Sequence, residues 1–192
     1  PIERRHVADL LARLVDKSLV LVDSGRYRLL DTIRQFAAER LADAGELEAV
    51  EARLLDWAVT LATAHDPDTQ VGAQSRSLEE LELDHDNVRA AIDGGLRHDP
   101  QGALLLVSRF WRFWLDRNFF TEGTRRVRAA LAAAPEATEL RSRALLAAAA
   151  LELRCGERQL FLDSGREADA IARRSRDAQH AAEVRHRAGL LY

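Results

Sequence analysis

The spacing of apolar residues predicts a short hairpin between two helices near the start of the chain. Residues 6–17 carry apolar side chains at helical spacing and are predicted to form a short helix. Residues 19–22 and 27–30 are short apolar runs, and the turn sequence between them at 23–26 contains a glycine. This arrangement predicts a β-hairpin, because glycine readily adopts the positive φ angles that tight turns require.

The segment after the hairpin is predicted to be a second helix that begins at Asp31 or Thr32 and ends at Gly45. Short oxygen-bearing side chains cap helix N-termini, and glycine is favoured at the left-handed position that ends a helix. The apolar face of this helix would consist of Ile33, Phe36, Ala37 and Leu41.

Amphipathic helices are expected over the rest of the chain. A long helix follows Gly45, with its end marked by residues 65–68, and it has apolar positions spaced alternately by three and four, at Leu47, Val50, Leu54, Trp57 and Leu61. A polar loop to about residue 75 follows. A short helix containing Leu78 and Leu81 then precedes a helix capped by Asp84 or Asp86, which ends between residues 94 and 100.

The segment 103–115 is apolar nearly all round, so we expect it to be buried on several sides, with Trp111 and Trp114 in the core. Residues 119–134 are predicted to form its antiparallel partner, which Pro135 ends. An alanine-rich helix at 138–154 would allow close helix approach at residues 147–150. A further helix to about residue 176 and a last one from near residue 178 complete the prediction.

The composition restricts the class of protein. Of 192 residues, 47% are hydrophobic, which is enough for a real core, and the net charge of −3 excludes a uniformly basic surface for nucleic acid. A single cysteine, Cys155, precludes an intramolecular disulfide and is typical of the cytoplasm, where we expect this protein. The longest apolar stretch is too short to cross a membrane. The absence of methionine predicts a piece of a longer protein.

Residues 107–135 resemble a tetratricopeptide repeat, a helix pair that stacks into solenoids. The large residues expected in its first helix are Val107, Phe110 and Trp114. In its second helix, the small, large, small and terminating positions correspond to Gly123, Val127, Ala130 and Pro135. Trp111 departs from the pattern, because a small residue is usual there. Residues 143–146 and 187–190 are weakly similar in sequence. The offset between them is 44 residues, which is longer than the ~34 residues of the usual repeat. The longer helices of MalT-like repeats would account for this offset.

Three strings, at residues 14–19, 27–37 and 84–91, resemble the STAND-class regulatory ATPases of bacteria, which include many LuxR-family transcriptional regulators. The resemblance implies a mainly α fold, in which a winged-helix remnant with a β-hairpin precedes a helical solenoid. It places the C-terminal part of a winged helix at 1–45, connecting helices at 46–98 and repeat-like helices at 99–192. Any ATP or ADP would bind to the parent protein, and no cofactor is expected in this chain.

Within that resemblance, Leu29, Leu30 and Asp31 align with the Met-His-Asp signature of the winged helix, whose histidine reads bound ADP. Leu30 replaces that histidine and cannot donate a hydrogen bond to a phosphate, so direct nucleotide sensing by this segment is not expected. Asp31 is expected to cap a helix. We expect all three residues to lie at a regulatory contact with a neighbouring domain.

Reaction centres are not evident in the sequence, and no enzyme activity is expected. Lys17 and Ser18 lack the preceding glycines of a phosphate-binding loop. The spacings Glu82/His85 and Glu183/His186 could contribute to a ferritin-like di-iron site, and one helical stripe could hold zinc, but solvated faces more often carry such patterns. That stripe consists of Asp177, His180, Glu183 and His186. Cys155 is expected to be inert, because no base can be assigned to it.

The predicted function is therefore regulatory. Repeats would bind a protein or small-molecule effector, and the winged-helix part would contact an upstream ATPase domain, with DNA reached only indirectly and no membrane involved. The alternative is a DNA-binding winged helix with a helical dimerisation tail. The helix before the hairpin would contact the DNA bases in that case. Its charged residues are Asp9, Arg13, Asp16 and Lys17, whose charges cancel. We expect the two densest clusters of basic side chains to be exposed to solvent. One cluster consists of Arg125, Arg126 and Arg128, and the other of Arg173, Arg174 and Arg176.

Overall fold

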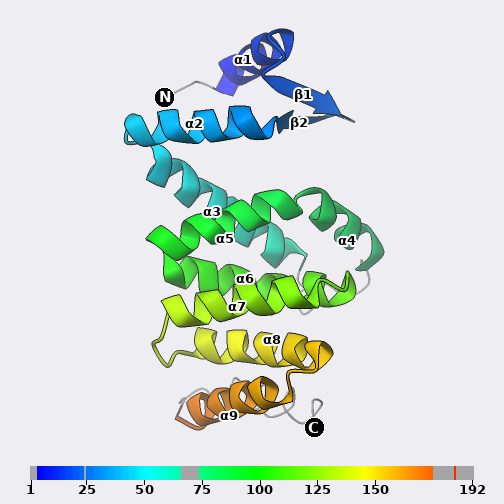
Figure 1. Cartoon of the computed structure of the whole chain (residues 1–192), viewed down its shortest axis with the longest axis vertical. Coiled ribbons are helices and arrows are strands. Elements are labelled where there is room, and N and C mark those ends of the chain that lie inside the picture. The colour runs from blue at the N-terminus through cyan, green and yellow to red at the C-terminus, as the bar shows by residue number, and fades with distance from the viewer. Residues whose placement is uncertain (1–3, 24, 66–73, 175–183, 185–192) are drawn as a thin grey trace. The chain divides into compact units, whose positions relative to one another are not determined.

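A computed structural model describes residues 4–23, 25–65, 74–174 and 184 of the chain. The chain is mainly helical with one two-stranded antiparallel hairpin, which confirms the predicted structural class. It divides into two compact units, Pro1–Ala49 and Val50–Tyr192, whose elements are labelled in Figure 1. Within the described residues, no helix is both long enough and apolar enough to cross a membrane.

The first unit has the predicted order of helix, hairpin and helix. Its elements are α1 (Arg4–Asp16), β1 (Val20–Asp23), β2 (Arg26–Leu29) and α2 (Asp31–Asp43). The strands pair antiparallel from Val20 opposite Leu29 to Asp23 opposite Arg26. Gly25 in the turn has a φ of +79°, which explains why the connection needs glycine.

The two ends of α2 differ in how well the sequence predicted them. Gly45 has a φ of +69° and its N–H donates to the Ala42 carbonyl, as expected for a helix that ends at glycine. The predicted cap at Asp31 or Thr32 is wrong. Leu30 occupies the cap position and offers no side-chain acceptor. Asp31 is instead the first helical residue, and its carboxylate pairs with Arg34 at 2.9 Å. At this position the negative charge also interacts favourably with the positive end of the helix dipole.

The second unit is built from consecutive helices. They are α3 (Leu47–Ala64), α4 (Gln74–Leu83), α5 (His85–His98), α6 (Pro100–Asp116), α7 (Phe120–Ala133), α8 (Glu139–Cys155) and α9 (Arg158–Arg174). From α4 to α9 each helix packs against the next one in the chain, and α5 also contacts α7 while α6 also contacts α8 (Figure 1). Of the helix predicted from near residue 178, the structure describes only Val184, which is helical and buried.

The core of the second unit is centred on α6. Phe110, Phe113 and Trp114 are fully buried there, which confirms the predicted burial of this segment and of Trp114. Trp111 lies at the edge of the core, because it is only partly buried and has the Arg112 guanidinium 5.2 Å from its ring centre. The predicted placement of Trp111 in the core is thus correct only in part.

The predicted stripe of α3 is correct only in part, because Leu54 and Leu61 pack against the core but are not the most buried residues of this helix. Leu55, Ala58 and Ala62 are its buried residues, whereas Trp57 is 39% exposed. A Cβ on Gly95 would lie 3.2 Å from the Leu55 side chain, so α5 approaches this face closely. The fully buried positions are thus shifted by one residue from the predicted Leu54, Trp57 and Leu61.

Close helix approach also occurs at Gly123 on α7. A Cβ there would lie 2.9 Å from Cβ of Trp114 on α6 and 3.0 Å from Cδ1 of Leu151 on α8. Only glycine fits between these two side chains without displacing one of them. The predicted close-packing stretch at residues 147–150 of α8 is buried throughout, which confirms that expectation.

Candidate functional site

An apolar groove opens in the first unit between α1, the hairpin and α2. Its volume is about 460 Å³. Its apolar lining includes Leu14, Leu19, Val20, Leu29, Ile33 and Phe36. Charged side chains reach the groove only from the C-terminal end of α2 and the residues just after it, at Arg40 and Glu46.

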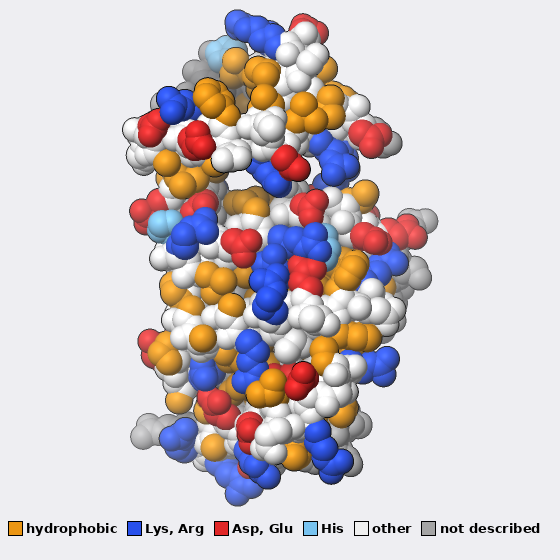
Figure 2. Space-filling model, viewed as in Figure 1, with side chains coloured by type: hydrophobic (Ala, Val, Ile, Leu, Met, Phe, Trp, Pro, Cys, Tyr) orange, Lys and Arg blue, Asp and Glu red, His pale blue; other side chains and the backbone are white. Residues whose placement is uncertain are grey.

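The groove leaves apolar side chains uncovered. Among the described residues of the first unit, Val20 alone is fully buried, while Phe36 is 58% exposed and Leu29 is 46% exposed. Hydrophobic side chains of this unit gather on the face seen at the top of Figure 2, where α1, the hairpin and α2 lie. Apolar clusters of this kind commonly mark interaction surfaces.

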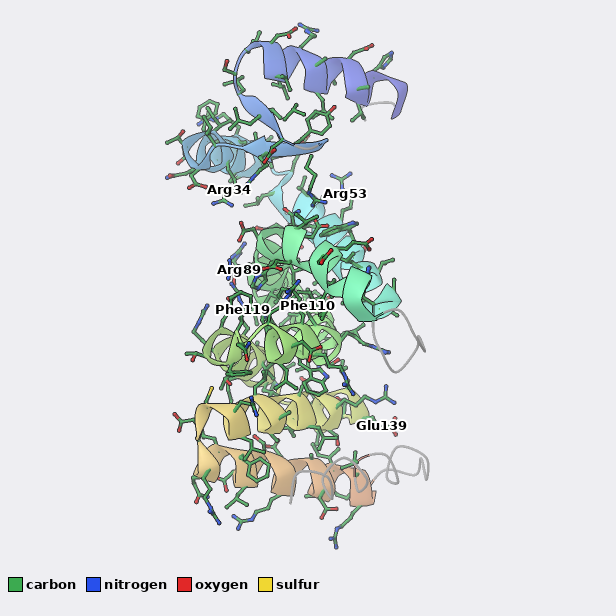
Figure 3. All side chains as sticks on the ribbon, turned by 90° about the vertical axis from the view of Figure 1, so that its right-hand side faces the viewer. Arg34, Arg53, Arg89, Phe110, Phe119 and Glu139 are labelled. Carbon is green, nitrogen blue, oxygen red and sulfur yellow. The ribbon has the colours of Figure 1, made fainter. Side chains whose placement is uncertain are left out.

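The three residues predicted to form a regulatory contact all lie on the surface of the first unit. Leu29 ends β2 and lines the groove. Leu30 follows it at the start of α2 and is 45% exposed, outside the lining of the groove. Asp31 is exposed and paired with Arg34, which Figure 3 labels. These positions leave all three side chains accessible to another protein surface.

The second unit contains a network of charged side chains between α5 and α7. The Glu122 carboxylate accepts hydrogen bonds from Arg89 at 2.7 and 2.5 Å and from Arg126 at 2.9 Å. Arg126 also donates to Asp93 at 3.0 Å. The hydrogen bonds from Arg89 lower the pKa of Glu122 to about 2, and the same contact raises the pKa of Arg89. These ion pairs fix the position of α7 along α5.

His85, at the start of α5, is buried beside this network in an aromatic cage. Its ring centre lies 4.9 Å from that of Phe113 and 5.2 Å from that of Phe119. The indole N–H of Trp114 donates to Nε2 of His85 at 3.3 Å, so the imidazole proton is assigned to Nδ1. Burial, together with nearby Arg89, lowers the pKa of His85. Figure 3 shows Arg89, Phe110 and Phe119 close together in this region.

A second charged contact joins α7, α8 and α9. Glu152 is completely buried, and its carboxylate accepts hydrogen bonds from Nε of Arg128 at 2.6 Å and from the Ser164 hydroxyl at 2.8 Å. Arg128 in turn donates to the Ser164 oxygen at 2.8 Å. Each of the three helices thus contributes one member of a closed polar group, which satisfies a carboxylate that would otherwise be costly to bury.

Arg141 ties the end of α7 to α8 and α9. Its Nη1 donates to the carbonyl oxygens of Leu131 at 2.6 Å and Ala134 at 2.9 Å, and its Nε donates to Glu167 at 2.7 Å. Carbonyl groups at a helix C-terminus lack partners within the helix. Arg141 therefore supplies hydrogen bonds that the last turn of α7 cannot make for itself.

The prediction that the basic cluster on α7 is solvated is wrong for two of its members. Arg126 is buried and paired with Glu122, while Arg128 binds the buried Glu152. Arg125 is exposed as expected. In the other cluster, Arg173 is exposed and pairs with Asp169, and residue 176 lies outside the described part of the chain. The guanidinium groups of Arg126 and Arg128 thus serve internal packing.

The residues at metal-like spacings make other contacts. Glu82 pairs with Arg117 at 2.8 Å, whereas His85 lies in the aromatic cage. Within residues 4–23, 25–65, 74–174 and 184, no group of three or more His, Cys, Asp or Glu side chains could hold a metal ion. The spacing Glu183/His186 and the stripe that begins at Asp177 fall outside those residues.

Two further sets of candidate residues remain, namely Cys155 and the charged residues on and just after α1. Cys155 ends α8 and is partly buried, with its Sγ 3.7 Å from the Thr124 hydroxyl. The charged residues that could face DNA, on α1 and just after it, are exposed, and acidic and basic side chains alternate among them, at Asp9, Arg13, Asp16 and Lys17.

The buried charge networks are the feature that the sequence analysis missed. Two signals were available in the sequence. Glu122 and Arg126 are four residues apart, a spacing at which helix side chains meet. Glu152 follows an uninterrupted apolar run in the alanine-rich helix, so its carboxylate lies on a helix with little polar surface. A charge on an apolar helix face indicates a buried partner.

Comparison with known proteins gives partial matches. A "Putative HTH-type transcriptional regulator" of Mycobacterium tuberculosis and another of Mycobacterium bovis are each 39% identical to this chain over 126 residues. The match covers 61% of this chain and 14% of either relative. An "Uncharacterized protein" of Mycobacterium tuberculosis is 50% identical over 46 residues, which is 22% of this chain and 12% of that protein. No protein-family model matches, and no solved structure does. The chain is thus similar to a small part of much longer proteins.

Proposed function

We propose that this chain is a regulatory, protein-interaction part of a transcriptional regulator of the STAND ATPase type. The similarity to proteins named as HTH-type transcriptional regulators, over 61% of the chain, carries this proposal. The three sequence strings that resemble STAND regulators support the finer assignment. ATP or ADP would bind in a domain of the parent protein and not to the residues of this chain.

The second unit would serve as a tetratricopeptide-like array that binds a protein or small-molecule effector. Two observations support this role. Helices contact both their sequence neighbours and, at α5 and α6, the next helix but one. The helices α7 and α9 begin 38 residues apart, at Phe120 and Arg158, which is close to the ~34 residues of the standard repeat. Stacked helix pairs offer an extended binding surface.

The first unit would act as the C-terminal part of a winged helix that docks on the ATPase domain of the parent. Leu29, Leu30 and Asp31 are our candidates for this contact, because they are exposed together at the junction of β2 and α2. Binding of an effector to the repeats would then change how firmly the domains hold together. This division assigns residues 46–98 to connecting helices and residues 99–192 to the repeats.

The replacement Leu30→His in the intact parent tests the proposed contact. Histidine restores a hydrogen-bond donor at the position that the resemblance aligns with an ADP-reading residue, so ADP should dissociate more slowly from the variant. The measurement is the release rate of a fluorescent ADP analogue. Leu21→His is the matched control, because Leu21 is 46% exposed and Leu30 is 45% exposed, yet Leu21 lies on β1 outside the signature. Equal release rates in both variants and the wild type would remove the signature from the argument.

A DNA-binding role for α1 is the second candidate, and the similarity to proteins named as HTH-type transcriptional regulators favours it. The exposed charges of α1 oppose it, because they largely cancel. Titration of this chain with labelled duplex DNA at low and at physiological salt distinguishes the two candidates. Binding that weakens steeply with salt and is reduced by Arg13→Glu would favour the DNA-binding role.

A further inference from the structure

We infer that Arg89 on α5 and Arg128 on α7 are equivalent residues of successive helix pairs, and that each locks its own pair to the next one. The first of these pairs is α4 and α5, which the proposed division of the chain counts among the connecting helices. With both arginine locks closed, α4 to α9 form one rigid body whose helix pairs do not open separately. This inference goes beyond the proposed function, because it needs neither nucleotide nor effector.

A five-residue string of α5 recurs in α7. Residues 88–92 read Val-Arg-Ala-Ala-Ile and residues 127–131 read Val-Arg-Ala-Ala-Leu. The two strings bury the same positions, namely the valine, the second alanine and the last residue. They also expose the arginine side chain to a similar extent, 36% at Arg89 and 34% at Arg128. The strings begin 39 residues apart, at Val88 and Val127, and α7 and α9 begin 38 residues apart, as expected for one repeated unit.

Each arginine binds a glutamate of the following helix pair at two points. Arg89 donates to the Glu122 carboxylate on α7 from Nε at 2.7 Å and from Nη2 at 2.5 Å. Arg128 donates to the Glu152 carboxylate on α8 from Nε at 2.6 Å, and its Nη2 lies 2.5 Å from the same carboxylate. The glutamate comes from the second helix of one pair and from the first helix of the other. A guanidinium held at two points fixes geometry as well as charge, so neither pair can slide along the next without breaking both contacts.

Both glutamates are poorly accessible to water. Glu152 is completely buried, and the Glu122 side chain is 17% exposed. The hydrogen bonds from Arg89 lower the pKa of Glu122 to about 2, so this carboxylate is charged at neutral pH. A charge at such a site is costly once its partner is removed. A shift of one helix pair against the next would separate each carboxylate from its cation, and the lock therefore resists that shift.

Arg166 occupies the corresponding position on α9, 38 residues after Arg128. Ala168, two residues later, is fully buried, as is Ala130 two residues after Arg128. The Arg166 side chain is 68% exposed and pairs at 3.3 Å with Asp163 on the same helix. Arg166 is therefore a matched control, because this ion pair does not join one helix pair to another.

Native-state hydrogen exchange of the full 192-residue chain tests the inference. Amide protons in the middle of α5, α7, α8 and α9 should exchange through one common opening, so their protection factors should agree within about threefold. In an array whose helix pairs open separately, protection differs from pair to pair. A larger difference between α5 and the later helices would overturn the inference.

Three variants test the locks themselves. Arg89→Met should make the α5 amides exchange about tenfold faster or more, because hydrogen bonds to a charged group are lost, while α8 and α9 change by less than about twofold. Arg128→Met should confine the acceleration to α8 and α9. In Arg166→Met, exchange in all of these helices should stay within about twofold of the wild type.

A fourth variant is used if Arg128→Met does not fold, since Glu152 would then be buried without its cation. Arg128→Met combined with Glu152→Leu removes both charges and should fold, with the same faster exchange in α8 and α9. Equal acceleration of all helices in Arg89→Met would overturn the inference, because the arginine would then stabilise the unit as a whole. Unchanged exchange in that variant would also overturn it, because the helix pairs would hold together without the lock. None of these results depends on ADP release, so this inference and the proposed function can fail separately.

Discussion

At the scale of single residues, His85 is buried among aromatic rings and charged side chains. It is held among Phe110, Phe113 and Phe119, and it accepts a hydrogen bond from Trp114 through its unprotonated nitrogen. The charged groups around it are Asp86 and Arg89 on α5 and Glu122 and Arg126 on α7. Burial and Arg89 oppose protonation more strongly than Glu122 and Asp86 favour it, and the pKa of His85 is lowered.

A lowered histidine pKa makes stability depend on pH in a defined direction. Below a pH of about 6.5 the unfolded chain binds a proton at His85 more readily than the folded chain does, so the free energy of unfolding falls as the pH falls. In His85→Gln this step should disappear, because glutamine can accept from Trp114 but does not titrate. Urea unfolding of both proteins between pH about 7.5 and 5 measures the difference. Identical pH slopes would contradict the neutral, buried imidazole.

Glu122 adds a second step at lower pH. Its pKa is lowered from 4.5 to about 2 by the hydrogen bonds from Arg89. The resulting stability is present above pH 4.5 and is lost as the pH falls through the folded pKa. The two steps begin at different pH values, near 6.5 for His85 and near 4.5 for Glu122, so the comparison with His85→Gln is made above about pH 5.

At the scale of helices and strands, helix starts show why chemically equivalent residues differ in effect. Asp99 precedes α6, and its carboxylate accepts from the Gly102 N–H at 2.9 Å, with Pro100 in the first turn. Asp84 precedes α5, but its carboxylate accepts from the Asn87 side chain and makes no backbone cap. The sequence identified both as candidates to end or begin a helix, yet only the geometry distinguishes them.

Asp99→Ala should destabilise the second unit by about 1 kcal/mol, because it removes the side-chain acceptor at the start of α6. Asp99→Asn keeps an acceptor in the same place and should restore most of the loss. Chemical unfolding monitored by circular dichroism gives both values. A loss of equal size in the two variants would assign the effect to charge and not to capping.

The elements themselves were largely predictable, because periodic apolar patterns and glycine or proline ends are local signals. The hairpin, the end of α2 at Gly45 and the buried α6 follow directly from such signals. Errors arose where a tertiary contact decides the outcome. The buried residues of α3 include Ala58 and Ala62, which are too small to stand out in a pattern of large apolar side chains. Arg126 points inward because Glu122 and Asp93 accept its hydrogen bonds; the spacing of four residues indicates Glu122, but no local pattern indicates Asp93 on α5.

At the scale of the whole molecule, the two units differ sharply in how much apolar surface they bury. The continuous core of the described residues extends from Leu55 to Val184 and lies entirely in the second unit. Among the described residues of the first unit, Val20 is the one buried apolar residue. The predicted contact residues Leu29, Leu30 and Asp31 could be chosen from sequence, but the groove beside them could not, because it depends on how three elements fold together.

This difference predicts independent folding of the second unit. A chain of residues 45–192, which keeps α3 whole, should retain a cooperative thermal transition close to that of the complete chain, because its core loses nothing. Differential scanning calorimetry and circular dichroism provide the comparison. Loss of the cooperative transition in the shortened chain would show that the first unit supports the core of the second.

The closed contact among Arg128, Glu152 and Ser164 also limits which length changes the gene can tolerate. One residue inserted into α8 between Arg141 and Glu152 would rotate the carboxylate by about 100° away from Arg128. The displaced carboxylate would then be buried without its cation, while Arg141 would still hold the end of α7. Insertions and deletions should therefore accumulate in the connections between helices and be purged from α8.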